Sequence, residues 1–177
     1  MRITPVRPVA ELLPIALAAD PPREVGEFRP PDLVEITTLN TAILLDIRYA
    51  GSDNFLGTPL YTEARAFLQR PAAEALLRVQ HSLAAEGYGL VVLDAYRPWY
   101  VTRLFWDATP PDKHRFVADP AQGSHHNRGC AVDLTLYELR TVALRGAWRG
   151  SPISACLEWR TSASHGSRSA TTRTRGP

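Results

Sequence analysis

The stretch from Ser124 to Asp133, which reads Ser-x-His-x-x-Gly-x-Ala-x-Asp, places the strongest constraint on how this chain folds. Apolar and small or polar residues alternate over 130–136, and this period of two predicts a strand. Gly129 lets the backbone turn sharply ahead of that strand. The sequence therefore predicts a loop that leads into a strand and brings the side chains of His126 and Asp133 together.

An imidazole and a carboxylate are ligands that suit a catalytic zinc ion, which uses three protein ligands and keeps one position open for water. A lone histidine near a strand is more often a satisfied surface or core residue. The pairing of His126 with Asp133 favours a metal site over that alternative, and His125 is expected to be an ordinary loop residue. With two cysteines and no Cys-x-x-Cys, the chain has neither a disulfide framework nor a cysteine zinc site.

The remaining pattern predicts strands that interleave with helices without a regular βαβ repeat. This favours an α+β fold, with a small central antiparallel sheet flanked by helices in a single domain. The predicted elements are an extended lead-in over 20–32, a strand over 41–49, helices over 61–70, 71–87 and 98–108, a strand over 89–94 and a loop over 108–123.

The chain divides into three parts by composition. Residues 1–27 form a lead-in, of which 9–19 weakly resembles a secretion signal. Residues 28–139 form the domain. Residues 140–177 are rich in Arg, Ser and Thr and are expected to be disordered. The domain is therefore expected to be incomplete at its C-terminal end. The formal charge is −4 over residues 1–139 and +6 beyond them.

This composition also limits the partners of the chain. A nucleic-acid partner is not expected, because few aromatic residues accompany the basic tail. No apolar stretch reaches the roughly 20 residues of a membrane span. The oligomeric state stays open, as does the choice between a cytoplasmic and a periplasmic location.

A second motif, Asp94-Ala95-Tyr96-Arg97-Pro98, directly follows the predicted strand over 89–94. Side chains at such a place are held by a rigid scaffold. The Arg97 guanidinium suits either an oxyanion or a substrate carboxylate. The structural alternative is an ion pair between Asp94 and Arg97 that closes the turn.

Together these motifs resemble the VanX-type D-alanyl-D-alanine dipeptidases, in the zinc peptidase group that includes D,D-carboxypeptidases and hedgehog-like domains. The resemblance rests on Asp46–Ala50 with Asn54–Phe55, on Asp94–Pro98 and on Ser124–Asp133, and spans roughly residues 28–139 in the family's order.

The resemblance implies one zinc ion held by His126 and Asp133, with Arg97 as the transition-state stabiliser. It implies that Ser124 and Asp94 contact the substrate, a small D-amino-acid dipeptide of cell-wall metabolism. Zinc would activate a water while a glutamate acts as general base. Resistance to glycopeptide antibiotics and recycling of D-alanine are both consistent with such an activity.

The family places its third zinc ligand and its base in a C-terminal Glu-x-x-His element, which this sequence lacks; the nearest counterpart, Glu158 to Thr161, has threonine in place of histidine. We identify no general base, and His81, His114 and His165 match no pattern. The change of composition after Leu139 suggests a shifted reading frame or a lost end, and hence impaired activity. The alternatives are a D,D- or L,D-carboxypeptidase, a non-catalytic cell-wall-peptide binding remnant and, last, a nucleic-acid binder.

Overall fold

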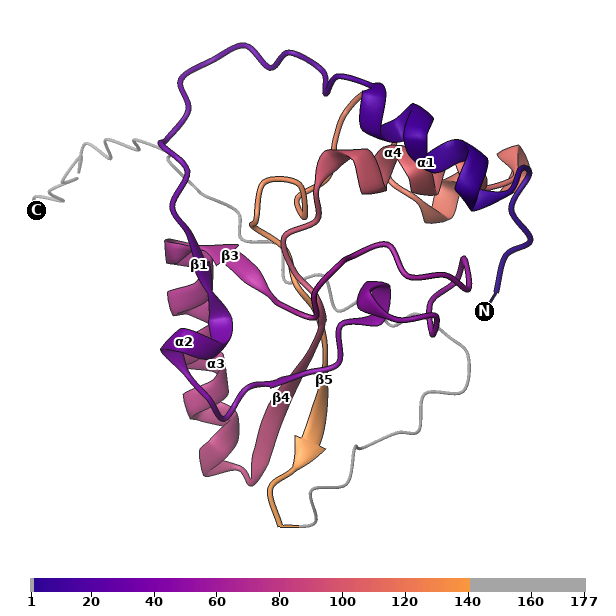
Figure 1. Ribbon diagram of the computed structural model, residues 1–177. Coiled ribbons are helices and arrows are strands. Elements are labelled where there is room, and N and C mark those ends of the chain that lie inside the picture. The colour runs from indigo at the N-terminus through magenta and orange to yellow at the C-terminus, as the bar shows by residue number, and fades with distance from the viewer. Residues whose placement is uncertain (1, 141–177) are drawn as a thin grey trace, which may run out of the picture.

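The computed structural model describes residues 2–140, which form two small sheets and the helices around them (Figure 1). In the larger sheet β4 (Tyr88–Asp94) is central, with β2 (Leu44–Leu45) parallel to it on one side and β5 (Asp133–Glu138) antiparallel on the other. The smaller sheet pairs β1 (Leu33–Glu35) with β3 (Phe67–Gln69) in antiparallel fashion. The predicted α+β class with small antiparallel pairings is confirmed, and β2 makes the larger sheet mixed.

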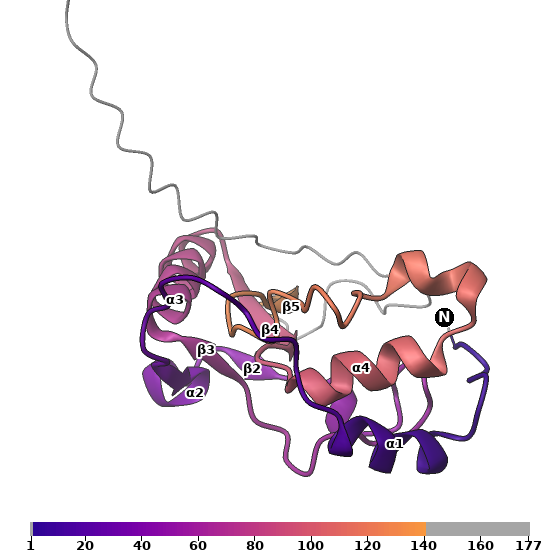
Figure 2. The same cartoon turned by 90° about the horizontal axis from the view of Figure 1, so that it is seen from above.

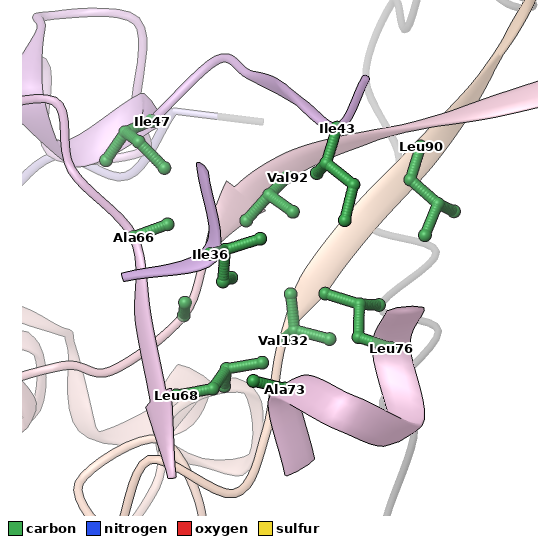
Figure 3. Packing of buried hydrophobic residues seen from close by; sticks show 11 residues of the cluster. Ile36, Ile43, Ile47, Ala66, Leu68, Ala73, Leu76, Leu90, Val92 and Val132 are labelled. Atoms are coloured by element: carbon green, nitrogen blue, oxygen red, sulfur yellow. The ribbon is translucent and has the colours of Figure 1, made fainter. Parts of the chain in front are cut away.

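One hydrophobic cluster fills the space between the two sheets and α3 (Arg70–Ala85) (Figure 3). Pro71 lies in the first turn of α3, where its missing N–H does no harm. The helix buries Ala73, Leu76 and Gln80 along one face, against Leu90 and Val92 of β4. Burial of this apolar face stabilises the domain, since each fully buried aliphatic side chain contributes about 1.5–3 kcal/mol.

A second cluster lies between α1 (Val9–Ala18) and α4 (Trp99–Ala108), at the opposite end of the molecule from α3 (Figures 1 and 2). Leu12 and Ala16 of α1 are buried against α4, which contributes Val101, Leu104 and Phe105. Most of the segment over 9–19 thus forms the packed helix α1, and its signal-like character stays a prediction. Within residues 2–140 no helix is both long enough and apolar enough to cross a membrane.

The helices predicted over 71–87 and 98–108 and the strand over 89–94 are confirmed as α3, α4 and β4. The structure also contains a four-residue helix, α2 (Ile36–Leu39), and the short 3-10 helices η1 (Arg48–Ala50) and η2 (Pro111–Phe116). The last of these lies inside the predicted loop over 108–123.

Three predicted elements were placed incorrectly. The helix over 61–70 is wrong: irregular chain leads to β3, because the N–H of Ile36 bonds the carbonyl of Ala66 and draws this segment into pairing with β1. The strand over 41–49 is limited to β2, since the chain turns into η1 at Arg48. The strand predicted over 130–136 begins only at Asp133, where pairing with β4 starts. The predicted basic tail lies outside the described residues from 141 onward.

An irregularity in the pairing of β4 with β5 determines what lies at the end of the sheet. Val92 pairs with Leu134 and Asp94 pairs with Asp133, so that Leu93 is an extra residue on β4. A bulge of this kind redirects the side chains around it. Here it places the carboxylates of two different motifs opposite each other at one end of the sheet.

Candidate metal centre

Three segments meet at the end of the larger sheet: the last residue of β4, the loop over 124–129 and the first residue of β5. The Nε2 atom of His126 lies 3.6 Å from Oδ1 of Asp133. Two ligands of a tetrahedral zinc ion, each about 2.1 Å from the metal, are about 3.4 Å apart. The spacing of these two atoms therefore fits a shared zinc ion.

The imidazole of His126 is held in one orientation by the backbone. Its Nδ1 atom lies 2.8 Å from the carbonyl oxygen of Ala95. Because a carbonyl only accepts hydrogen bonds, Nδ1 donates to it, which leaves Nε2 as the ring nitrogen that faces Asp133. A histidine that ligates a metal is typically fixed in this way through its other ring nitrogen.

Asp133 is the more accessible carboxylate of the site, with 24% of its side chain exposed. Its Oδ2 lies 3.8 Å from Nη2 of Arg97. Partial burial by itself raises the pKa of the Asp133 carboxyl, but its interactions with His126 and with the Arg97 charge outweigh burial and hold that pKa below its usual value. The carboxylate is therefore ionised at neutral pH, as a metal ligand requires.

Asp94 and Arg97 form a buried ion pair, which is the structural alternative weighed above. Nε and Nη2 of Arg97 donate to Oδ2 of Asp94 at 2.9 and 2.7 Å. The hydroxyl of Tyr61 donates to the other oxygen of Asp94 at 2.9 Å. Asp94 is 1% exposed, and both of its oxygens are hydrogen-bonded inside the protein.

Aromatic rings surround the guanidinium of Arg97. Its Cζ lies 4.9 Å from the ring centre of Phe105 and 5.5 Å from that of Tyr49, within the range of cation–π attraction. Burial opposes the charge on Arg97, but the Asp94 carboxylate beside it more than compensates and raises its pKa. Burial likewise raises the pKa of Tyr61, and the Asp94 charge adds to this, so the phenol stays a hydrogen-bond donor.

Asp94, His126 and Asp133 are the one group of three potential metal-ligating side chains within residues 2–140, with ligand atoms within 4.8 Å of one another. Asp94 is a poor third ligand, because its oxygens accept hydrogen bonds from Arg97 and Tyr61. Its Oδ2 atom also lies 3.8 Å from Nδ1 of His126, which is the ring nitrogen hydrogen-bonded to the Ala95 carbonyl and not the one that faces Asp133. The described part of the chain therefore offers two candidate metal ligands, His126 and Asp133.

Ser124 lies at the start of the loop and supports its turn. Its hydroxyl accepts the backbone N–H of His126 at 3.2 Å. Gly129, at the end of the same turn, has a φ of +65° and lies against Leu33 and Gln69, so a side chain there would be strained and crowded. The sharp turn predicted at Gly129 is thus present in the structure.

Among the described residues, the other histidines and Cys130 do not join the group of potential metal ligands. His125 is exposed in the loop, and His81 is exposed on α3. His114 stacks on Trp106, with ring centres 3.8 Å apart. Cys130 is partly buried, and its thiol donates to the carbonyl of Arg128. His165 lies outside the described residues.

Three groups at the site were missed from the sequence. The sequence predicts a helix around Tyr61, and nothing in the local pattern links Tyr61 to Asp94. The Ala95 carbonyl that fixes His126 is a backbone atom, which a motif of side chains does not show. Asn127, inside the first motif, bonds the start of α4, and its polar side chain between two site residues was the only available signal.

Comparison with known proteins adds independent evidence. Residues 30–147 match the peptidase family M15, described as D-ala-D-ala dipeptidase. The chain is 35% identical over 105 residues to the D-alanyl-D-alanine dipeptidase of Escherichia coli K12, an alignment that covers 59% of this chain and 53% of the relative. It is 36% identical over 117 residues to the enzyme of the same name from Enterococcus faecium, covering 56% and 58%.

A third relative covers a larger share. The D-alanyl-D-alanine dipeptidase of Streptomyces coelicolor is 34% identical over 140 residues, which is 69% of each chain. The chain spans somewhat more than half the length of the first two relatives. The family match extends over the larger part of the chain and includes every residue of the candidate site. The chain therefore belongs to the M15 D-Ala-D-Ala dipeptidase family of metallopeptidases.

Proposed function

We propose that this protein hydrolyses D-alanyl-D-alanine at a site where His126 and Asp133 hold one zinc ion. The observation that carries the proposal is the ligand pair, with Nε2 of His126 3.6 Å from Oδ1 of Asp133 and the opposite ring nitrogen fixed on Ala95. The substrate is taken from the names of the relatives, which are D-alanyl-D-alanine dipeptidases.

Bound zinc supplies a Lewis acid for the scissile carbonyl and a water whose pKa is lowered to about 7. Arg97 lies beside Asp133 and stabilises the negative charge that develops on the carbonyl oxygen. Two of its nitrogens are held by Asp94, and within residues 2–140 Nη1 donates no hydrogen bond. Asp94, predicted to bind substrate, contributes in this arrangement by holding Arg97.

Ser124 is proposed to contact the dipeptide. Its hydroxyl oxygen already accepts from the N–H of His126, which leaves the hydroxyl proton to donate to a substrate carbonyl or carboxylate. A small dipeptide suits a site whose polar groups are few and close together.

The described residues supply neither a third ligand nor a general base. Two protein ligands bind zinc more weakly than three, and a missing base lowers the rate by roughly 10²–10⁴. We therefore expect hydrolysis that is measurable, sensitive to chelators and slow.

The test compares two neighbouring histidines. The full chain is loaded with zinc, its metal content is measured by elemental analysis, and release of D-alanine from D-Ala-D-Ala is followed. We expect His126→Ala to lose both zinc and hydrolysis. His125→Ala is the matched control, because the His125 side chain is exposed and makes no hydrogen bond or ion pair within residues 2–140. We expect this variant to keep both its zinc and its hydrolytic activity.

Equal zinc content in the His126→Ala and His125→Ala proteins contradicts the proposal, and so does hydrolysis that survives a chelator. Release of D-alanine from a cell-wall pentapeptide but not from the dipeptide makes the protein a carboxypeptidase. Chelator-insensitive binding of D-Ala-D-Ala without hydrolysis makes it a binding module.

A further inference from the structure

Asn127 follows the proposed zinc ligand His126 directly and has no part in the chemistry proposed above. Its side chain nevertheless crosses from the ligand loop to the start of α4. We infer that Asn127 is a positioning residue that fixes the His126 loop against the Arg97 turn, and so determines where the metal ligand lies relative to Arg97. The inference rests on the proposed function for its catalytic meaning.

The Asn127 amide uses both of its N–H donors and one lone pair of its oxygen within the site. Its Nδ2 donates to the carbonyl of Arg97 at 2.9 Å and to Oγ1 of Thr102, also at 2.9 Å. Its Oδ1 accepts the backbone N–H of Ser124 at 2.8 Å. One side chain therefore joins the loop, the Asp94–Pro98 turn and the first turn of α4.

The partners leave no freedom in how this amide is oriented. The Arg97 carbonyl can only accept a hydrogen bond, and the Ser124 N–H can only donate one, so the amide nitrogen and oxygen are assigned without ambiguity. Thr102 is fully buried in α4. Loss of the amide would leave this hydroxyl and a backbone carbonyl without their partner, which buried polar groups tolerate poorly.

The contacts of Asn127 reinforce a backbone contact at the same place. The N–H of Arg97 donates to the carbonyl of His126 at 3.0 Å. Two consecutive loop residues thus hydrogen-bond the backbone of Arg97: His126 accepts from its N–H, and Asn127 donates to its C=O. Two residues before Arg97, the Ala95 carbonyl fixes the His126 ring, so a displacement of the loop against this turn would also displace Nε2.

The experiment measures local mobility and metal binding separately in the full chain. Amide hydrogen exchange is followed in peptides that contain residues 95–98 and 124–129, and zinc affinity is measured by competition with a chromophoric chelator. We expect Asn127→Ala to speed exchange in both segments and to weaken zinc binding about 10- to 100-fold, the usual effect of removing a group that orients a ligand.

Variants of Thr102 separate the contact from general packing. Thr102→Val removes one of the three hydrogen bonds and should give a smaller loss of affinity, whereas Thr102→Ser keeps the hydroxyl and should bind zinc like the wild type. Gln80→Leu is the matched control, since Gln80 is a buried amide in α3 whose Oε1 accepts the N–H of Leu90 at 2.9 Å. It should lower the melting temperature without changing zinc affinity.

Unchanged exchange in either segment of Asn127→Ala overturns the inference. Faster exchange with unchanged zinc affinity also overturns it, because Asn127 would then support the fold without positioning the ligand. A wild-type chain that binds no zinc contradicts the proposed function instead. In that case the exchange of residues 95–98 and 124–129 alone decides whether Asn127 couples the two segments.

Discussion

The Asp94–Pro98 turn and the Ser124–Asp133 loop lie against each other, but they use their polar side chains in opposite ways. In the turn, Asp94 is 1% exposed and gives both oxygens to Arg97 and Tyr61. In the loop, Nε2 of His126 and the carboxylate of Asp133 face each other at 3.6 Å, longer than an ordinary hydrogen bond.

This difference shows how burial assigns different roles to two aspartates in one site. A carboxylate whose hydrogen bonds are all satisfied inside the protein has little left for an external ligand, and it holds its partner in place. A partly exposed carboxylate beside a histidine ring nitrogen keeps oxygen atoms for a metal ion. In the proposed site the turn is therefore the support, and His126 of the loop and Asp133 at the start of β5 are the metal ligands.

The largest effect that tests this comparison is expected from Asp94→Asn. The variant leaves the Arg97 charge buried without its partner, which destabilises a protein by about 3–5 kcal/mol. Urea unfolding at neutral pH measures the loss. Asp107→Asn is the matched control, because Asp107 pairs with Arg103 on α4 at 2.7 Å in a more exposed setting, and such a pair contributes about 0.3–0.5 kcal/mol. Equal losses in the two variants would mean that the turn is not a rigid support.

A smaller effect is expected from Tyr61→Phe. The ring stays, but Asp94 loses the hydroxyl that donates to its Oδ1 at 2.9 Å. A hydrogen bond to a charged group contributes about 1.5–3 kcal/mol, so the free energy of unfolding should fall by an amount in this range. Tyr100→Phe is the control, because Tyr100 packs against the cluster between α1 and α4 and does not bond Asp94. This variant should have nearly the same stability as the wild type. A Tyr61→Phe protein as stable as the wild type would show that Asp94 does not depend on the phenol.

The smallest effect is expected from Asp133→Asn in the metal-free protein. The pKa of Asp133 is lowered in the folded state, so its charge stabilises the fold above the usual aspartate pKa of about 3.9 and this contribution is lost as the pH falls through the lower folded value. The stability difference between wild type and variant should therefore be larger at pH 7 than at pH 3. A difference that grows toward pH 3 would mean that the pKa is raised and that the comparison is reversed.

Much of the scaffold was predictable from local patterns. The 3.6-residue period behind Pro71 and the apolar run over 89–94 each reflect burial of one face or one strand, and both elements are where they were expected. The segment over 61–70 was not predictable in this way. Its pairing with β1 involves residues some 30 positions earlier, and no local propensity shows that partner.

The candidate site likewise has a part that the local sequence indicates and a part that it does not. The residue types of His126 and Asp133 and their spacing around Gly129 indicate a metal pair from the sequence alone, and the family match covers both residues. The third ligand and the base were not found in the sequence, and within residues 2–140 the structure adds no usable side chain to the pair.

The available chemistry could be predicted from the chain, because the ligand types, a turn-forming glycine and the strand alternation are properties of a few neighbouring residues. The different settings of Asp94 and Asp133, which underlie their proposed roles, depend on the packing of the folded chain. The bulge at Leu93, the Tyr61 hydroxyl and the Ala95 carbonyl come from segments distant in sequence. The physical reason is that burial and hydrogen-bond satisfaction depend on which segments pack together, and these determine whether a carboxylate supports the fold or binds a metal.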